Sequence, residues 1–295
     1  MPSVFHALKT KGFKKTIRRG ANYLDRYGFT SQKMTKNILD FVDLIKKNDA
    51  KVTFPITAKT LEKHSDFIKN ITDANVEFAV HGYTHIDYTK QNAKFQNDHI
   101  TKAVALFKDI GIRPYGFRGP YLQANDDTLK AIKENDLIYD SSASILWNIV
   151  PEHYIMQGKK SYNLAKKLYN CNSSNISSPY MWNNLVRIPV TLPDDEMLID
   201  RLNIKNQRLI AKIWSKILCK SYEQGGSFVL QLHPERLPFA LGALEEIIVE
   251  ANKKEIWITS LKELATYWMN NGKFKDCRSV LCITGDIDII SLWDF

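Results

Sequence analysis

The stretch Val76-Glu-Phe-Ala-Val80-His81-Gly-Tyr-Thr-His85 joins a short apolar run to two histidines four residues apart. The run has the length and composition of a buried strand, so the histidines follow directly on its carboxyl end. Two imidazoles at this spacing can face one point on a turn, which suits two ligands of one metal ion. The same spacing also arises by chance in surface loops, so the rest of the sequence has to decide.

Apolar runs and amphipathic stretches alternate on both sides of this segment. Strands are predicted at 51–57, 76–80, 114–118, 137–140, 185–190, 227–232, 255–259 and 279–284. Helices are predicted at 31–48, 59–72, 91–110, 126–135, 196–223, 238–253 and 261–271. The alternation predicts an α/β fold, a distorted (β/α) barrel of seven to eight mostly parallel strands. An open doubly wound sheet is the alternative, but no glycine-rich dinucleotide fingerprint follows any strand.

Domain organisation follows from the absence of any linker, repeat or low-complexity segment in the sequence. We expect residues 1–295 to form a single barrel domain, with a basic helix at 1–24 and a strand at 279–288 that completes the barrel. The stretch 148–183 is rich in Asn and Ser and is predicted to be an irregular insertion that covers one end of the barrel.

Composition places the chain among globular proteins, with 44% hydrophobic and 25% charged residues. The net charge of +9 favours anionic partners, but no nucleic-acid module is present, so no nucleic-acid partner is expected. Residues 1–24 include a basic segment that predicts either peripheral membrane contact or a solvated outer helix. No secretory signal is recognisable and the four cysteines show no paired spacing, which predicts a cytoplasmic protein. The oligomeric state stays open.

Reactive side chains follow most of the predicted strands, and in a parallel barrel such positions meet at one face. In chain order they are His81 and His85; Arg118, Pro120 and Tyr121; Asp140 with Trp147 beyond; Asp194 and Asp195; His233; Asp286 and Asp288. Two neutral imidazoles and one carboxylate make a three-ligand metal site with positions left for water and substrate. A second carboxylate and an opposite histidine would then serve as base and acid, so the pattern indicates metal-assisted hydrolysis.

At these residues the chain resembles the polysaccharide deacetylases, carbohydrate esterase family 4. His81-Gly-Tyr-Thr-His85 is similar to the family's His-(Ser/Thr)-x-x-His motif, with Gly82 where Ser or Thr is usual. Arg118-Gly-Pro120-Tyr121 resembles its Arg-x-Pro-Tyr motif, and Leu230-Gln-Leu-His233 its Leu-x-x-His motif. Asp140 with Trp147 is a looser match to the Asp/Trp motif that lines the substrate groove. The order and spacing of these motifs agree over residues 31–271.

The family's opening motif, a strand ending in Thr-Phe-Asp-Asp-Gly, has no counterpart before the first predicted helix, where only Asp25 stands, followed by Arg26. The run Leu281-Cys-Ile-Thr-Gly285-Asp286-Ile-Asp288 near the C-terminus is an apolar strand that ends in two carboxylates. A closed barrel places its last strand beside its first, so we expect 279–288 to fill the vacant place, as in a circular permutation. The alternative is that 273–295 is an added outer strand and Asp25 the only surviving carboxylate.

The resemblance implies a role for each matching residue. His81, His85 and Asp288 would bind zinc or another divalent transition metal, and Asp286 would be the base held by Arg118, although the two aspartates could exchange roles. The backbone N–H of Tyr121 would help to form an oxyanion hole. His233 would be the general acid, with Asp140 as its orienting partner. Trp147, Asp194 and Pro120 would contact the carbohydrate substrate; the alternatives are a core position for Trp147 and a solvated turn for Asp194.

The function implied is a metal-dependent hydrolase that removes acetyl groups from N-acetylated sugars or a polysaccharide precursor. Two alternatives remain: a metal-free amidase-like hydrolase of another non-peptide C–N bond, and a non-catalytic glycan-binding descendant. Retention of both histidines and of a candidate aspartate pair argues against the metal-free amidase.

Overall fold

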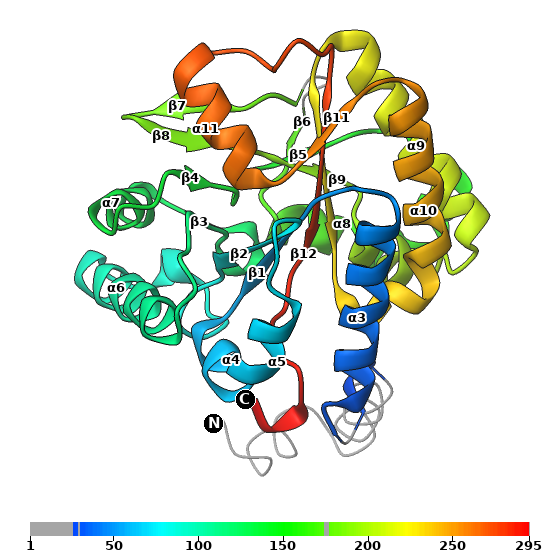
Figure 1. Cartoon of the computed structure of the whole chain (residues 1–295). Helices are drawn as coiled ribbons and strands as arrows, with labels where there is room; N and C mark the ends of the chain where they lie inside the picture. Colours follow the sequence, from blue (N-terminus) through cyan, green and yellow to red (C-terminus); the bar gives the residue numbers. More distant parts are fainter. Residues whose placement is uncertain (1–25, 29, 174–176, 295) are drawn as a thin grey trace.

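The structure is a computed structural model that describes residues 26–28, 30–173 and 177–294 (Figure 1). The basic helix predicted at 1–24 and Asp25 lie outside the described residues. In the described part, no helix is long and apolar enough to cross a membrane.

A curled, mostly parallel sheet forms the centre of the fold (Figure 1). Its strands are β1 (Val52–Ile56), β2 (Val76–Val80), β3 (Gly116–Phe117), β4 (Tyr139–Asp140), β5 (Ser144–Leu146), β6 (Asn172–Ser173), β7 (Tyr180–Trp182), β8 (Leu185–Arg187), β9 (Val190–Leu192), β10 (Ser227–Leu232), β11 (Trp257–Thr259) and β12 (Val280–Gly285). The order is β6-β5-β9-β10-β12-β1-β2-β3-β4-β8-β7, and β11 pairs with β12. Only the β7–β8 pair is antiparallel among these pairs of the described chain.

The sheet curls until it meets itself. β4 and β5 belong to one continuous segment, and β8 and β9 to another. These segments run parallel, because Tyr139 pairs with Val186 and Ser144 with Val190. The β4–β8 pair lies near one end of the strand order and the β5–β9 pair near the other, so the two ends of the sheet meet along these two segments. The result confirms the predicted α/β class and distorted (β/α) barrel.

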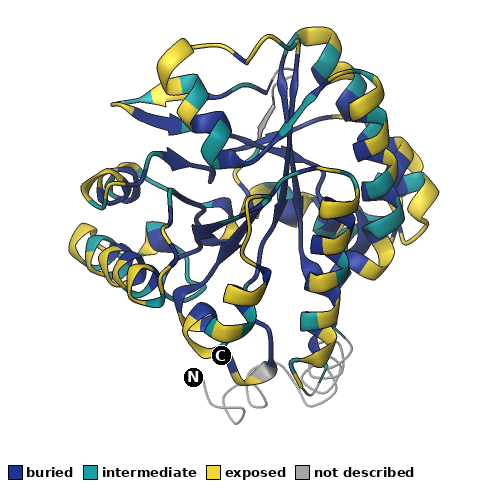
Figure 2. Ribbon diagram, in the orientation of Figure 1, coloured by how far each residue is buried: buried dark blue, intermediate teal, exposed yellow. Residues whose placement is uncertain are grey.

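The C-terminal strand β12 lies inside the sheet, parallel to its three partner strands. Along one side it pairs with β10 over its whole length, from Ser227↔Val280 to Leu232↔Gly285. Along the other side its first half pairs with β11 and its second half with β1. All its residues are buried, as are those of β1 and β10, which explains why these strands read as apolar runs instead of alternating ones (Figure 2).

Helices pack around the outside of the sheet with their exposed faces toward solvent (Figures 1 and 2). They are α3 (Gln32–Lys47), α4 (Ala58–Lys63), α5 (Ser65–Ile71), α6 (Ala93–Ile110), α7 (Asp126–Glu134), α8 (Glu152–Leu168), α9 (Gln207–Gln224), α10 (Leu237–Lys253) and α11 (Leu261–Asn271). Short 3₁₀ turns are η1 (Tyr88–Lys90), η2 (Pro120–Leu122), η4 (Pro234–Arg236) and η5 (Leu292–Asp294), and η3 (Glu196–Arg201) is a π-helical turn.

Several predicted elements differ from the observed ones, and the predicted strand 185–190 is divided into β8 and β9. The predicted helix 59–72 is interrupted at His64 and forms α4 and α5. The predicted helix 196–223 is divided into η3 and α9. The insertion 148–183 is not wholly irregular, because it contains the seventeen-residue helix α8. Tyr162 and Ala165 are the buried residues of α8, so its sequence carries little of the apolar periodicity that identifies a helix.

Truncation of a buried side chain of β12 should destabilise the whole fold. Ile283 is fully buried and pairs with β1 and β10, so Ile283→Ala should lower the free energy of unfolding by about 2–5 kcal/mol. Urea denaturation followed by circular dichroism measures the change. Ile258→Ala in β11 is the matched control, because Ile258 is only half-buried and should cost less. Equal losses would show that β12 is no more central than β11.

Candidate active site

The carboxyl ends of β1, β2, β10 and β12 open into one pocket of about 350 Å³. This volume lies in the range of small-molecule sites, about 300–1,000 Å³. Its lining includes His81 and His85, Tyr121, His233, and Asp286 and Asp288. The pocket thus brings together side chains from four predicted strand ends that lie far apart in the sequence.

His81, His85 and Asp288 form a compact group whose potential ligand atoms all lie within 4.8 Å of one another. Asp288 Oδ1 is 3.3 Å from His81 Nε2 and 3.5 Å from His85 Nε2. Two ligands bound tetrahedrally at 2.0–2.2 Å from one ion are separated by about 3.3–3.6 Å. The observed separations therefore match three ligands around a common centre.

The protonation states of these residues also fit a metal ion. His81 Nδ1 lies 2.7 Å from the carbonyl oxygen of Arg118, to which it donates, so Nε2 keeps its lone pair for a ligand bond. Burial lowers the pKa of His85, which favours the neutral imidazole. Burial acts to raise the pKa of Asp288, but His85 and His81 hold it well below its usual range. Asp288 Oδ1 is buried and has no hydrogen bond within the part of the chain that the structure describes.

The loop between the two histidines contains a glycine that the structure requires. Gly82 has a φ of +83°, and a Cβ atom there would lie 2.7 Å from the hydroxyl oxygen of Tyr88. That hydroxyl accepts a hydrogen bond from the backbone N–H of Tyr83 at 3.1 Å. Tyr88 thus supplies a buried oxygen to the loop in which the family usually carries Ser or Thr, which accounts for the departure at Gly82.

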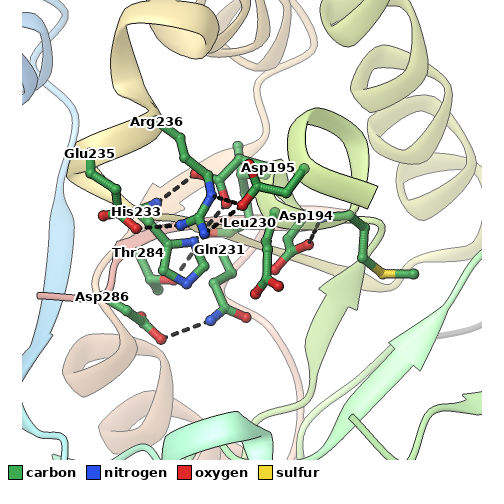
Figure 3. A network of polar contacts seen from close by, with 12 residues as sticks. Asp194, Asp195, Leu230, Gln231, His233, Glu235, Arg236, Thr284 and Asp286 are labelled. Atoms are coloured by element: carbon green, nitrogen blue, oxygen red, sulfur yellow. Dashed lines mark hydrogen bonds and ion pairs between the residues drawn. The ribbon is translucent and has the colours of Figure 1, made fainter. Parts of the chain in front are cut away.

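Asp286 lies beside this group and is held on both carboxylate oxygens. Arg118 donates to Oδ1 at 2.7 Å. Gln231 donates to Oδ2 at 2.8 Å (Figure 3). Arg118 is itself fully buried and bonds Thr284 Oγ1 and Ser141. The pairing of Asp286 with Arg118 was predicted, but Gln231 was not. The signal was available, because Gln231 in β10 stands two residues before His233, so the two side chains point to the same face of the sheet.

His233 is paired with Asp195 and not with Asp140, so the predicted orienting partner was wrong. Its Nδ1 lies 2.7 Å from Asp195 Oδ1, and its backbone N–H donates to Asp195 Oδ2 at 2.6 Å (Figure 3). The reason is strand order: Asp195 follows β9, the neighbour of β10, whereas Asp140 ends β4. Burial acts to lower the pKa of His233, but the Asp195 carboxylate holds it well above its usual value. The imidazole is therefore a proton donor at neutral pH.

Asp140 has a structural position behind the Arg118 turn. Its Oδ2 accepts from Arg187 Nε at 2.9 Å, and its Oδ1 accepts from Ser142 Oγ. Ser142 Oγ in turn accepts from the backbone N–H of Gly119 at 2.7 Å. Asp140 therefore supports the turn that follows Arg118 and does not reach the pocket.

Three of the four remaining predicted residues lie away from the pocket lining. Trp147 is 2% exposed and packs in the core, which excludes a stacking contact with a sugar in this structure. Asp194 is fully buried and its Oδ1 caps the backbone N–H of Met197 at 2.8 Å. Pro120 is buried in η2. Tyr121 does line the pocket: its ring packs edge-on against His85, with centroids 4.6 Å apart.

The backbone at Tyr121 and Leu122 has an uncommon conformation. Their φ angles are +60° and +54°, in the left-handed region that non-glycine residues rarely occupy. Two such residues in succession turn the chain sharply beside the histidines. Strained backbone of this kind gathers at binding and catalytic sites, where the surrounding structure maintains it.

A second metal-like group, Asp194, Asp195 and His233, is better explained as a proton-holding network. Both oxygens of Asp195 already bond His233. Burial, with the Asp195 carboxylate beside it, raises the pKa of Asp194 to about 8, so Asp194 is protonated at neutral pH. A neutral carboxyl group and a protonated imidazole do not make a cation site.

One wall of the pocket is a charged network that sequence analysis missed. Glu235 accepts from Arg236 at 2.5 Å and from Tyr27 at 3.2 Å, and Arg236 donates to Asp200 at 2.8 and 2.9 Å (Figure 3 shows the Glu235–Arg236 part). Glu196 accepts from Tyr169 and Arg201. The sequence Pro234-Glu-Arg does not predict this network, because the partners of Glu235 and Arg236 lie in distant segments, at Tyr27 and in η3.

The curled (β/α) sheet, with two histidines and paired aspartates at its carboxyl ends, defines the class of polysaccharide deacetylase-like barrels. Residues 25–139 match the polysaccharide deacetylase family. The match covers less than half of the chain and supports its resemblance to that family.

Two curated relatives resemble part of the chain. Peptidoglycan deacetylase-like protein FGM2 of Gibberella zeae is 34% identical over 108 residues, 36% of this chain and 31% of the relative. Peptidoglycan deacetylase of Helicobacter pylori is 30% identical over 129 residues, 42% of this chain and 43% of the relative. The match therefore spans less than half the length of either relative.

Solved structures resemble a larger part of the chain. A protein of Mycobacterium smegmatis assigned to the polysaccharide deacetylases aligns with a TM-score of 0.61 at 17% identity, over 81% of this chain and 78% of that one. A corresponding protein of Pseudomonas aeruginosa PAO1 gives 0.63 at 18% identity, over 81% and 74%. Puue allantoinase gives 0.63 at 20% identity, over 81% and 74%. At these identities the likeness establishes the shared fold.

Replacement of Asp195 should change the protonation of His233. Its raised pKa means that His233 contributes stability fully below pH ~6.5, the unfolded value, and that this contribution is lost as the pH rises through the folded value. In Asp195→Asn the burial remains without the carboxylate, so the pKa should fall below its usual value. NMR titration of the His233 ring protons measures the shift, with exposed His153 as the internal control. An unchanged His233 titration would contradict the assignment.

Restoration of the usual family residue at position 82 should damage this chain. Gly82→Ser should lower the free energy of unfolding by about 1–3 kcal/mol, because its Cβ meets Tyr88 and its φ is positive. Gly272→Ser is the matched control: its φ is +63°, but nothing lies within 4 Å of the added Cβ. Chemical denaturation of both variants separates backbone strain from the clash. Equal losses would show that Tyr88 imposes no constraint on Gly82.

Proposed function

We propose that the chain is a metal-dependent hydrolase that removes acetyl groups from N-acetylated sugars of a polysaccharide or its precursor. The observation that carries this proposal is the grouping of His81, His85 and Asp288 beside Asp286 in one pocket. His233, which lines the same pocket, adds a protonated imidazole. These are the ligands, base and acid that metal-assisted amide hydrolysis needs.

In this proposal His81, His85 and Asp288 hold zinc or another divalent transition metal. When bound, the ion supplies Lewis acidity that polarises the acetyl carbonyl and lowers the pKa of water. Asp286, fixed by Arg118 and Gln231, accepts the proton of the attacking water. His233 donates a proton to the departing sugar amine, and Asp195 keeps it protonated until then. The backbone N–H of Tyr121 stabilises the developing oxyanion.

The substrate class rests on the family and on the relatives. The matched relatives are named as peptidoglycan deacetylases, which supports an N-acetylated glycan strand. The family match ends at residue 139, so the roles of His233, Asp286 and Asp288 are supported by the geometry of the pocket. The four cysteines are all unpaired, which is consistent with the proposed cytoplasmic location and with a glycan precursor as substrate.

The place of β12 supports a second part of the proposal, that it fills the slot of the family's opening strand. It lies between β10 and β1, parallel to both, and Asp286 and Asp288 follow it directly. This arrangement favours the C-terminal aspartates over Asp25 as the source of the reactive carboxylates.

Removal of the metal should abolish activity, and the Asp286 and Asp288 variants should lose activity for different reasons. Acetate release from N-acetylated glycan oligomers should stop after chelation and return with added zinc. Asp288→Asn should not recover with zinc because a ligand is lost. Asp286→Asn should still bind zinc but lose about 10²–10⁴-fold in kcat, the usual contribution of a general base.

Controls decide between this proposal and its alternatives. Asp25→Asn should keep full activity, and Asp98→Asn, an exposed carboxylate paired with Lys94, should also be silent. Activity that survives chelation would indicate the metal-free amidase class. Zinc binding without acetate release from any N-acetylated glycan would indicate a glycan-binding descendant.

A further inference from the structure

Asp288 reaches the histidines on a segment that leaves the sheet directly after β12. Among the described residues, Ile287 makes the last backbone hydrogen bonds to β1 and the residue after it: its N–H donates to Pro55 O at 2.8 Å, and its carbonyl accepts from Thr57 N at 3.4 Å. Beyond Ile287 no strand pairing holds the segment within the described residues. The position of the Asp288 carboxylate therefore depends on how the chain after Ile287 is fastened.

The first fastening is a pair of threonines at the start of α4. Thr57 Oγ1 and Thr60 Oγ1 donate to the backbone carbonyl of Asp288 at 3.1 and 2.9 Å. Thr57 is 2% exposed and Thr60 1% exposed, so both bonds are protected from water. Both bonds end on one atom, the carbonyl oxygen of Asp288, so they do not determine the direction of the turn that follows.

The second fastening is Asp294, a buried carboxylate six residues further on. Its Oδ2 accepts from the backbone N–H groups of Ile290 and Ser291, both at 2.8 Å, and its Oδ1 accepts from Ser291 Oγ at 3.1 Å. These bonds close residues 290–294 into a compact turn. Ile289 and Ile290, 4% and 0% exposed, anchor the turn in the core.

His64 joins this turn to the junction between α4 and α5. Its Nε2 lies 3.1 and 3.0 Å from the two oxygens of Asp294. A carboxylate only accepts, so His64 Nε2 carries the proton and donates. Burial acts to raise the pKa of Asp294, but His64 and the backbone N–H groups lower it to about 2, so the carboxylate is ionised. Loss of any one of these donors leaves a buried carboxylate less well hydrogen-bonded, which lowers the stability of the turn.

We propose that the Asp294–His64 pair is a latch that positions Asp288 for metal binding. This inference rests on the proposed function, because it assigns Asp288 to an ion. The threonines hold Asp288 and the latch holds residues 290–294, so the segment is fastened on both sides of Ile289 to α4 and its two caps, Thr57 and His64. Outer contacts that orient a ligand typically contribute 10–100-fold to metal affinity. Asp294 and His64 are positioning residues in this scheme.

The test uses the full chain in the variants Asp294→Ala and His64→Phe, the second of which keeps a ring but removes the donor. Hydrogen exchange of the metal-free protein should be faster at the amides of residues 286–291 in both, with β2 and β10 unchanged. Zinc affinity, measured by competition with a chromogenic chelator, should fall about 10–100-fold. The double variant should bind zinc as tightly as Asp294→Ala alone, because Asp294→Ala already removes the contact that His64→Phe removes.

A control removes another carboxylate that accepts a backbone hydrogen bond in a turn, the exposed Asp73. Asp73 accepts from the backbone N–H of Asn75 at 2.8 Å and pairs with Lys46, ahead of β2. Asp73→Ala should leave zinc affinity and the exchange of 286–291 at wild-type values.

The outcomes separate the latch from the proposed function. Unchanged exchange at 286–291 in both variants would overturn the latch, whatever the protein binds. Faster exchange with wild-type zinc affinity would overturn its positioning role. A wild-type protein that binds no zinc, manganese or cobalt would refute the metal-dependent function and with it the role assigned to Asp288, while the exchange data would still show whether Asp294 and His64 hold the segment.

Discussion

The pairing of β12 between β10 and β1 is the constraint on which the site depends. The six residues of β12 bond to β10 in continuous register, and their last residues bond to β1. Each strand that ends at the pocket is set relative to β12 directly or through one neighbour. A slip of one residue in this register would turn Asp286 and Asp288 to the opposite face of the sheet. The register of one buried strand therefore fixes the chemistry of the pocket.

The pocket contains several buried charged side chains, and most of them are paired with a group of opposite charge. Arg118 is fully buried and opposite Asp286, and Arg236 is shared between Glu235 and Asp200. Asp195 is matched by a protonated His233, and Asp194 avoids a second negative charge by keeping its proton. Among the described residues, Asp288 Oδ1 lacks a hydrogen bond, as do Gln231 Oε1 and Asp194 Oδ2. Asp288 Oδ1 differs from these two because it lies 3.3 and 3.5 Å from two imidazole nitrogens, so a cation placed among the three side chains would satisfy it.

Much of this arrangement could be predicted from the sequence, because strong local signals coincided with the topology. Apolar runs identified the strands, and in a parallel barrel their carboxyl ends meet, which was enough to gather His81, His85, Arg118, His233 and the C-terminal aspartates. The pairing of His233 with Asp195 instead of Asp140 was beyond reach, since it depends on β9 lying beside β10. Helix α8 was missed because few of its side chains are buried. Trp147 was assigned to the substrate groove because of the family resemblance, whereas it packs in the core.

The distance along the chain between the histidines and Asp288 has a consequence for biosynthesis. A ribosome that has just completed His85 must still add about 200 residues before Asp288 exists. Two imidazoles alone bind a divalent ion weakly, so the nascent chain presents no finished cage while most of the barrel is unmade. Insertion of β12 then completes the sheet and brings Asp288 to the two histidines in one event. If these three residues hold the proposed ion, the order of translation delays its capture until the sheet is complete.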